Sequence, residues 1–343
     1  MAASSKIPSV SFVIPVLNSG DVLANCLFSI RAQKYPQNKI KIIIVDGGST
    51  DETIDIARSY HCHIIENSLK TAEAGKSIGV DCVSTDLVAL IDSDNILPST
   101  TWLKMMVIPL RQDSRILGAE PWSFTYRSLA GFIERYSSLI GANDPYTLIA
   151  GNYDRQNLIT NNWTSLNIHI YNHRYYQSFA IKRGQIIPTI GANGTIYRSN
   201  FLQQYKTGDY FFDIDYLSLA LKSIKQVHFA KVKIGIIHTY CESSLTKFYQ
   251  KQLRRVKDLY IYKNERYYPL VHNHFKPSFL FTLYVLTIFP MIYHSLLGYF
   301  RQRDKAWFFH PIACIITFYV YSTQTILYFL GLNQPQSRHQ WHQ

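Results

Sequence analysis

The decisive stretch of this sequence reads Leu87-Val88-Ala89-Leu90-Ile91-Asp92-Ser93-Asp94-Asn95. Its unbroken apolar run is typical of a strand that is buried on both faces of a parallel sheet. Open α/β sheets bind ligands at the carboxyl ends of their strands, so Asp92 and Asp94 are expected at such a site. Both carboxylates can reach a hard divalent cation that also holds a diphosphate. The alternative is an Asx turn that only ends the strand.

The residues before this stretch alternate between apolar runs and segments with helical periodicity. Strands are predicted at Val10–Pro15, Ile40–Val45 and His63–Glu66. Apolar residues between Val22 and Ile30 recur with i, i+4, i+8 spacing, which predicts a helix with one apolar face, and a further helix is expected over Ala74–Val83. This β-α-β-α-β order predicts an α/β fold with a mostly parallel central sheet and right-handed crossovers.

Four blocks of the sequence resemble, in order and rough spacing, the motifs of the family 2 glycosyltransferases. The blocks are Phe12–Asn18, Ile43–Asp51, Ala74–Val80 and Leu90–Asp94, the last of which contains an Asp-x-Asp motif. The resemblance is strong over about the first hundred residues and continues weakly to about Arg255. It implies a GT-A-type fold and an inverting, metal-dependent transferase. The donor would be a nucleotide diphospho-sugar, with a UDP-sugar as the expected one.

The resemblance also implies roles for single residues in donor binding. Pro15 and Asn18 would line the nucleoside pocket, and Asp46 would accept a hydrogen bond from the base. Lys76 would face the phosphates, where a cation is chemically suited. Asp92 would touch the ribose or the metal. The alternatives are a solvated surface lysine for Lys76 and a turn carboxylate for Asp46.

A divalent metal, Mg²⁺ or Mn²⁺, is the cofactor that the resemblance implies. Asp94 would be its principal ligand, with Asp92 beside it, and the ion would bridge the diphosphate. His238 ends the apolar stretch Val232–Ile237 and is a candidate to complete the metal shell or to touch a phosphate. A structural histidine is the alternative for His238.

A second acidic segment, Phe211–Leu217, resembles the family segment that supplies the catalytic base. Asp213 aligns with that base and Asp215 is the reserve candidate, while Phe212 replaces the glutamate of the usual form. Direct displacement at the anomeric carbon needs a carboxylate near the incoming hydroxyl to take its proton. A structural acid at a helix N-terminus is the alternative for either aspartate.

The segment Gln252–Val256 partly matches the Gln-x-x-Arg-Trp signature of processive family members. Val256 stands where the tryptophan would be, so polymerisation is not expected, while Arg255 is a candidate phosphate ligand. The surrounding basic residues lie just before an apolar segment, which favours anionic membrane lipids over nucleic acid as their partner. They are Lys247, Lys251, Arg254, Arg255, Lys257, Lys263 and Arg266.

Two apolar stretches without Asp, Glu, Lys or Arg follow, Ser278–Phe300 and Ala306–Leu332. As a helix the first is roughly 34 Å long, enough for a bilayer core, and Pro290 would kink it without excluding it. The linker 301–305 is net basic, and the positive-inside rule argues against placing it outside. Membrane attachment is therefore expected, by spanning helices, by a hairpin in one leaflet or by interfacial helices.

The chain has 343 residues and a formal net charge of +12, which suits an anionic donor and an anionic surface. Its length fits a transferase domain over residues 1–270, two membrane helices over 278–332 and a polar tail over 333–343. Within the transferase domain, residues 1–120 would bind the nucleotide sugar and residues 121–270 the acceptor. Scattered cysteines and a polar start without a signal peptide predict a cytoplasmic catalytic domain.

These observations predict a membrane-attached inverting glycosyltransferase with a lipid-linked or glycan acceptor. A non-catalytic nucleotide-sugar-binding scaffold at the membrane is the alternative, and the pair Asp94 and Asp213 disfavours it. A nucleotidyltransferase also uses a metal with paired carboxylates. It is disfavoured because the first strand is not followed by a glycine-rich loop with Lys or Arg.

Overall fold

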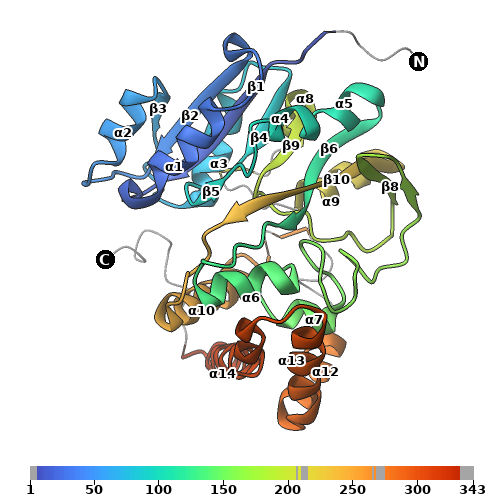
Figure 1. Cartoon of the computed structure of the whole chain (residues 1–343). Helices are drawn as coiled ribbons and strands as arrows, with labels where there is room; N and C mark the ends of the chain where they lie inside the picture. Colours follow the sequence, from blue (N-terminus) through green and yellow to red (C-terminus); the bar gives the residue numbers. More distant parts are fainter. Residues whose placement is uncertain (1–5, 206–207, 210–214, 265, 268–274, 333–343) are drawn as a thin grey trace. The chain divides into compact units, whose positions relative to one another are not determined.

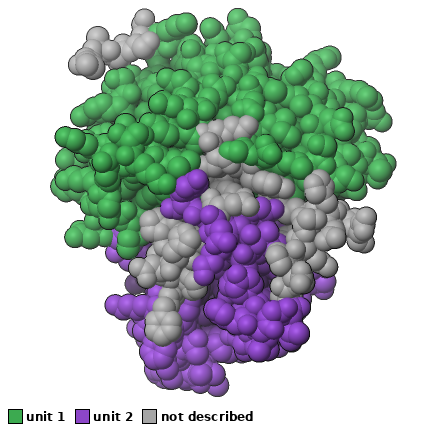
Figure 2. All heavy atoms as spheres, turned by 180° about the vertical axis from the view of Figure 1, so that it is seen from behind, with its two compact units in different colours: residues 1–122, 167–238, 338–343 green, residues 123–166, 239–337 purple. Residues whose placement is uncertain are grey.

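The computed structural model describes residues 6–205, 208–209, 215–264, 266–267 and 275–332. These residues form two compact units, which Figure 2 colours separately. Unit 1 takes its described residues from 1–122 and 167–238, and unit 2 takes them from 123–166 and 239–337. Each unit is described by itself below.

Unit 1 is built on a mixed β-sheet whose first four strands are parallel, in the order β3-β2-β1-β4 (Figure 1). All seven residues of β1 are buried, because β1 pairs on both sides and is covered on both faces. The observed bounds agree with the predicted strands to within one residue. They are Val10–Val16 for β1, Ile40–Asp46 for β2, His63–Glu66 for β3 and Leu87–Leu90 for β4.

The remaining strands continue the sheet in the order β4-β9-β6-β10-β8-β7, and β5 pairs with the end of β10. The pairs β4–β9, β9–β6, β10–β8, β8–β7 and β10–β5 are antiparallel. The pairs β3–β2, β2–β1 and β1–β4 are parallel, as the β-α-β pattern of the N-terminal sequence predicts. The bounds are Asn95–Ile96 (β5), Ile116–Phe124 (β6), Ile170–Asn172 (β7), Tyr176–Lys182 (β8), Thr195–Arg198 (β9) and Gln226–His238 (β10).

The helices of unit 1 follow the strands along the chain. Helix α1 buries Leu23, Cys26, Leu27 and Ile30 on one face, as the apolar spacing predicted. Helix α3 begins where the Thr71 hydroxyl accepts a hydrogen bond from the backbone N–H of Ala74. The bounds are Gly20–Arg31 (α1), Gln37–Lys39 (η1), Thr53–Ser59 (α2), Ala72–Asp81 (α3), Trp102–Met106 (α4), Ile108–Gln112 (α5), Ser199–Gln204 (α8) and Asp215–Ser223 (α9).

Unit 2 is mainly helical. Apolar residues recur at helical spacing from Trp122 to Ile140, which by itself would predict one long helix. The chain is helical there only from Phe132 onward, because Trp122 belongs to β6 and Gly131 precedes the first helical residue of α6. The bounds are Phe132–Ile140 (α6), Tyr146–Ala150 (α7), Leu245–Ile261 (α10), Phe275–Leu286 (α12), Phe289–Arg301 (α13), Lys305–Phe308 (η2) and Phe309–Phe329 (α14).

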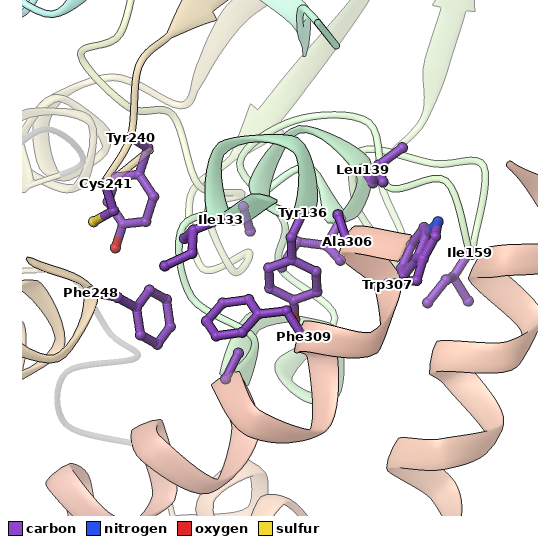
Figure 3. Close-up of a cluster of buried hydrophobic side chains, with 13 residues drawn as sticks. Ile133, Tyr136, Leu139, Ile159, Tyr240, Cys241, Phe248, Ala306, Trp307 and Phe309 are labelled. Carbon is purple, nitrogen blue, oxygen red and sulfur yellow. The ribbon is translucent and has the colours of Figure 1, made fainter. Parts of the chain in front are cut away.

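One buried cluster joins α6 to the C-terminal helices of unit 2 (Figure 3). The ring of Tyr136 meets that of Phe309 edge to face, with centroids 5.3 Å apart, and meets that of Trp307 in the same way at 6.4 Å. Trp307 is fully buried. The apolar C-terminal segments therefore supply part of the core that also holds α6.

The first predicted membrane stretch is broken into α12 and α13, which meet at 85°. The break includes Ile288, whose φ of +60° is strained for a β-branched residue, and Pro290 lies in the first turn of α13. Among the described residues, one helix is long and apolar enough to cross a membrane, Lys305–Phe329, and the bent pair is a second candidate only if both halves count as one span.

Candidate active site

The loops after β1 and β2 are bound to each other at the carboxyl edge of the parallel strands. The Asp46 carboxylate accepts hydrogen bonds from the backbone N–H of Ser49 at 3.1 Å and from its hydroxyl at 2.6 Å. Asn18 has a φ of +47°, which asparagine tolerates, and its side-chain oxygen accepts from the N–H of Thr50 at 2.9 Å. Asp46 therefore stabilises its own turn, and its contact with a base stays a prediction.

Helix α3 approaches the end of β1 closely. A Cβ placed on Gly75 would lie 2.8 Å from the Cβ of Pro15, so only glycine fits there without a shift. The next residue, Lys76, is buried, and its Nζ lies 2.8 Å from Oδ1 of Asp92. This burial excludes a solvated surface lysine. A cation held in this way beside the strand ends would attract the phosphates of a donor.

The predicted partners Asp94 and His238 meet across the pairing of β5 with β10. Asn95 is opposite His238 in this antiparallel ladder, which brings Nε2 of His238 within 3.4 Å of Oδ2 of Asp94. The turn that carries Asp94 is fixed by two hydrogen bonds. The N–H of Asp92 donates to Oδ1 of Asn95 and the N–H of Asn95 donates to the carbonyl of Asp92, both at 3.0 Å.

The side chains of Asp94 and His238 fit a divalent metal as donors, because Mn²⁺ accepts carboxylate and imidazole ligands. The Asp94 side chain is 22% exposed, so it is open to an ion. In the part of the chain that the structure describes, three or more His, Cys, Asp or Glu side chains nowhere gather to hold a metal.

A buried thiol lies beneath this turn. The Sγ atom of Cys26 is 3.9 Å from the carbonyl oxygen of Asp92. Burial raises the pKa of the Cys26 thiol well above its usual range, and the nearby charges of Asp94 and Asp92 act in the same direction. Burial thus disfavours the thiolate, which is the form of cysteine that binds metals.

The loop 190–195 lies against the strand that leads into Asp92. The N–H of Gly194 donates to the carbonyl of Leu90 at 2.9 Å. Gly194 has a φ of +77°, and a Cβ there would lie 2.4 Å from Cδ1 of the buried Ile236. Two constraints, backbone conformation and space, thus require glycine at this position.

A buried ion pair beneath the same loop escaped the sequence reasoning. Glu120 of β6 and Lys231 of β10 are fully buried and paired with each other. The second carboxylate oxygen of Glu120 accepts a hydrogen bond from the N–H of Gly191 at 2.9 Å. The available signal was one acid and one lysine, each inside a strand-like apolar run, because a charge is rarely fully buried unless it is paired.

The other predicted site residues are placed as follows. Asp213 lies outside the described residues. Asp215 is the first residue of α9 and is fully buried, where a carboxylate favours the helix N-terminus. Arg255 belongs to α10 of unit 2, where its Nη1 lies 2.6 Å from Oε1 of Gln252 and 3.5 Å from Oδ2 of Asp144.

Unit 2 contains a cavity of about 750 Å³ lined by residues 126–131, Glu134, Glu242 and Ser243. Arg127 donates two hydrogen bonds to Oε1 of Glu134, at 2.8 and 2.7 Å. The backbone of Glu242 caps α6, since its carbonyl accepts from the N–H groups of Ile133 and Glu134. The cavity therefore has a fixed wall that carries hydroxyl, carboxylate and guanidinium groups.

Replacement of Gly194 by alanine is expected to destabilise the chain more than replacement of Gly184. Gly184 has a similar φ of +84° but open space around it, so Gly184→Ala should cost only the left-handed backbone penalty, about 1–2 kcal/mol. Gly194→Ala adds the clash with Ile236. The comparison of the two urea unfolding midpoints measures the difference, and equal midpoints would show that the loop relaxes freely.

Residues 11–205, more than half of the chain, match the family described as Glycosyl transferase family 2. The chain belongs to this family. Its mixed α/β sheet is therefore that of a glycosyltransferase with a GT-A-type fold.

Two curated relatives of this glycosyltransferase are 30% identical to it over short stretches. Glycosyltransferase AglE of Haloferax volcanii matches over 139 residues, which are 39% of this chain and 45% of that protein. Poly(ribitol-phosphate) beta-glucosyltransferase of Bacillus spizizenii matches over 102 residues, 28% of this chain and 16% of that protein. The matched stretch thus covers less than half the length of these relatives.

A solved structure supports the fold over nearly the whole chain. It is the mannosyltransferase PcManGT from Pyrobaculum calidifontis in complex with GDP-Man and Mn²⁺. The TM-score is 0.53 at 12% sequence identity, and the match covers 94% of this chain and 88% of that one. At this identity the likeness shows the fold alone.

Proposed function

We propose that this glycosyltransferase moves a sugar, with inversion, from a nucleotide diphospho-sugar to a lipid-linked or glycan acceptor at a membrane. The proposal that the donor is a nucleotide diphospho-sugar rests on one observation. Four side chains lie together at the carboxyl edge of the sheet, those of Lys76, Asp92, Asp94 and His238. Open α/β sheets bind their ligands at this edge. A UDP-sugar is the proposed donor.

The proposed donor site divides into a nucleoside part and a phosphate part. Pro15, Asn18 and Asp46 would surround the nucleoside, where the hydrogen bonds between the two loops already fix the backbone. Lys76 would face the diphosphate, and Asp94 with His238 would hold the metal. A bound Mg²⁺ or Mn²⁺ would supply Lewis-acid neutralisation of the charge on the leaving diphosphate. The similar fold of PcManGT, solved with GDP-Man and Mn²⁺, supports this arrangement.

The proposed reaction is a direct displacement. The acceptor oxygen bonds to the anomeric carbon while the bond to the diphosphate breaks, and the nucleoside diphosphate leaves with the electron pair. Asp213 takes the proton of the acceptor hydroxyl. Loop 190–195 is the proposed acceptor-side wall, which Glu120 anchors through Gly191.

A panel of nucleotide sugars, titrated by calorimetry into the full-length protein with Mn²⁺, tests the donor assignment. Binding of UDP-sugars together with slow hydrolysis of the bound donor supports the proposal. Binding without any hydrolysis or transfer would favour the non-catalytic scaffold. Preference for GDP-sugars would leave the glycosyltransferase assignment intact and show that the nucleobase of the donor is guanine rather than uracil.

The base assignment predicts different results for two neighbouring aspartates. Asp213→Asn should lower transfer by about 10²–10⁴-fold and leave nucleotide diphosphate affinity near normal, because the base acts only on the acceptor. Asp215→Asn should chiefly lower stability, since this buried carboxylate starts α9. Transfer rates, calorimetric affinities and melting temperatures of both variants separate the roles. If Asp215→Asn transferred sugar slowly while Asp213→Asn transferred it at the wild-type rate, Asp215 and not Asp213 would be the catalytic base.

Membrane attachment with a cytoplasmic catalytic domain completes the proposal. It is supported by the long apolar helix Lys305–Phe329 and by the basic residues of α10. Attachment would raise the local concentration of a lipid-linked acceptor and orient it toward the donor site.

A further inference from the structure

Each of the three C-terminal helices exposes a stripe of apolar side chains at helical spacing. A helix surface that faces water carries polar residues at such positions, so these stripes require an apolar partner. The exposed residues are Phe279, Leu280, Leu283 and Leu286 of α12, Phe289, Ile292, Tyr293, Leu296 and Phe300 of α13, and Ile312, Ile315, Tyr319, Ile326 and Phe329 of α14.

The opposite face of α14 packs against α10 along much of its length. Phe309 at its start meets Phe248 with ring centroids 5.3 Å apart. Near its end, Tyr328 stacks on Tyr260 at 4.2 Å, and the hydroxyl of Thr325 lies 2.6 Å from that of Tyr260. Helix α10 thus accompanies α14 from end to end.

Helix α10 is too charged to enter a hydrocarbon core. Six of its residues between positions 247 and 258 carry charged side chains, and Lys247 and Arg254 are exposed. If α14 crossed a bilayer, α10 would be drawn in beside it, and each charge at the bilayer centre is costly. The charged residues are Lys247, Lys251, Arg254, Arg255, Lys257 and Asp258.

The bent pair α12–α13 is also too short to cross. At the helical rise its two arms are about 18 and 20 Å long, against a hydrocarbon core of about 30 Å, and the 85° bend prevents them from adding end to end. Cationic residues flank the apolar helices, with Lys276, Arg303 and Lys305 all exposed. This combination fits the interface of an anionic leaflet, where apolar faces insert and cations stay at the headgroups.

We infer that α12, α13 and α14 attach this glycosyltransferase to one leaflet of an anionic bilayer, and that the chain does not cross it between Phe275 and Leu332. The inference rests on the membrane attachment that belongs to the proposed function. The apolar stripes would contact the lipids of that leaflet, because the cations that border the stripes match its anionic headgroups. The acceptor would then be reached from the same side as the donor.

Thiol labelling in a bacterial host tests the one-leaflet topology. In the full-length protein, Cys62→Ser removes a partly exposed thiol, so that labelling of the exposed Cys82 shows on which side of the membrane unit 1 lies. With Cys82→Ser added, Arg303→Cys and Leu332→Cys report the two ends of α14. Spheroplasts and inside-out vesicles are treated with a membrane-impermeant maleimide, and detergent gives the full signal. We expect both ends to label only from the side of Cys82. Labelling of the two ends from opposite sides would overturn the inference.

The binding of the protein to lipid vesicles tests whether the exposed apolar stripes contact lipid. Ile315→Lys and Tyr319→Lys lie on the exposed stripe of α14 and should each weaken binding to 3:1 phosphatidylcholine–phosphatidylglycerol vesicles by about tenfold or more. Phe28→Lys, on a 66% exposed phenylalanine of α1, is the matched control and should bind as wild type. Equal binding by all variants, or a detergent-free dimer that leaves vesicles unbound, would contradict the inference.

Donor hydrolysis, measured on the same samples, keeps the two proposals apart. A wild-type protein that binds vesicles from one side but hydrolyses no nucleotide sugar would remove the proposed reaction and leave the topology intact. A protein that hydrolyses nucleotide sugars but has α14 across the bilayer would leave the proposed reaction intact and remove the one-leaflet topology.

Discussion

Asp94→Asn is expected to lower sugar transfer by about 100- to 1000-fold, because a bound metal supplies several kcal/mol of transition-state charge stabilisation. The carboxylate lies in a turn fixed by Asp92 and Asn95, with His238 at 3.4 Å, and the amide removes its charge while keeping its shape. The fold should therefore persist. Initial transfer rates with saturating donor and Mn²⁺ measure the loss.

Binding of Mn²⁺ gives a readout that does not depend on turnover. Electron paramagnetic resonance of Mn²⁺ with nucleoside diphosphate should show weaker binding to Asp94→Asn than to wild type. Asp55→Asn is the matched control, since Asp55 is an 81% exposed carboxylate of α2. Full activity of Asp94→Asn, or of wild type in excess chelator, would remove the metal from the mechanism.

The parts of the site that follow from local sequence were predictable. An apolar run that ends in polar residues fixes both a buried strand and the edge at which its carboxylates emerge, so β4 and Asp94 could be read together. His238 was proposed in the same way, as the polar end of an apolar stretch, and its role in metal binding stays a prediction. Their 3.4 Å contact depends on the pairing of β5 with β10, and strand pairing between distant segments leaves no local signal.

The buried pair of Glu120 and Lys231 shows where sequence reasoning stopped. Each residue is one charge inside an apolar run, and on an edge strand or a surface it would have been solvated. Only the neighbouring positions of β6 and β10 in the sheet bring the two charges together and give Glu120 a second partner in Gly191. Hydropathy did identify the apolar C-terminal segments. It could not distinguish the faces of these helices that pack in the core from the faces that are exposed.

Trp307→Ala is expected to destabilise unit 2 by about 3–5 kcal/mol, the usual cost of truncating a buried tryptophan. The indole is fully buried, it meets Tyr136 edge to face, and a Cβ on Gly298 would come within 2.3 Å of it. Thermal unfolding in detergent, with proteolysis of unit 2 as a second probe, measures the effect.

The adjacent residue supplies the control, because Phe308 is 49% exposed on the other side of the same turn. Phe308→Ala should leave the melting temperature in detergent nearly unchanged and weaken vesicle binding instead. The pair thus separates core packing from lipid contact within two residues. Equal melting temperatures for Trp307→Ala and wild type would mean that the C-terminal helices are a detachable anchor. A chain cut after Lys276 should then keep a folded unit 2, whereas a large loss in Trp307→Ala predicts that such a cut exposes the core around Tyr136 and unfolds it.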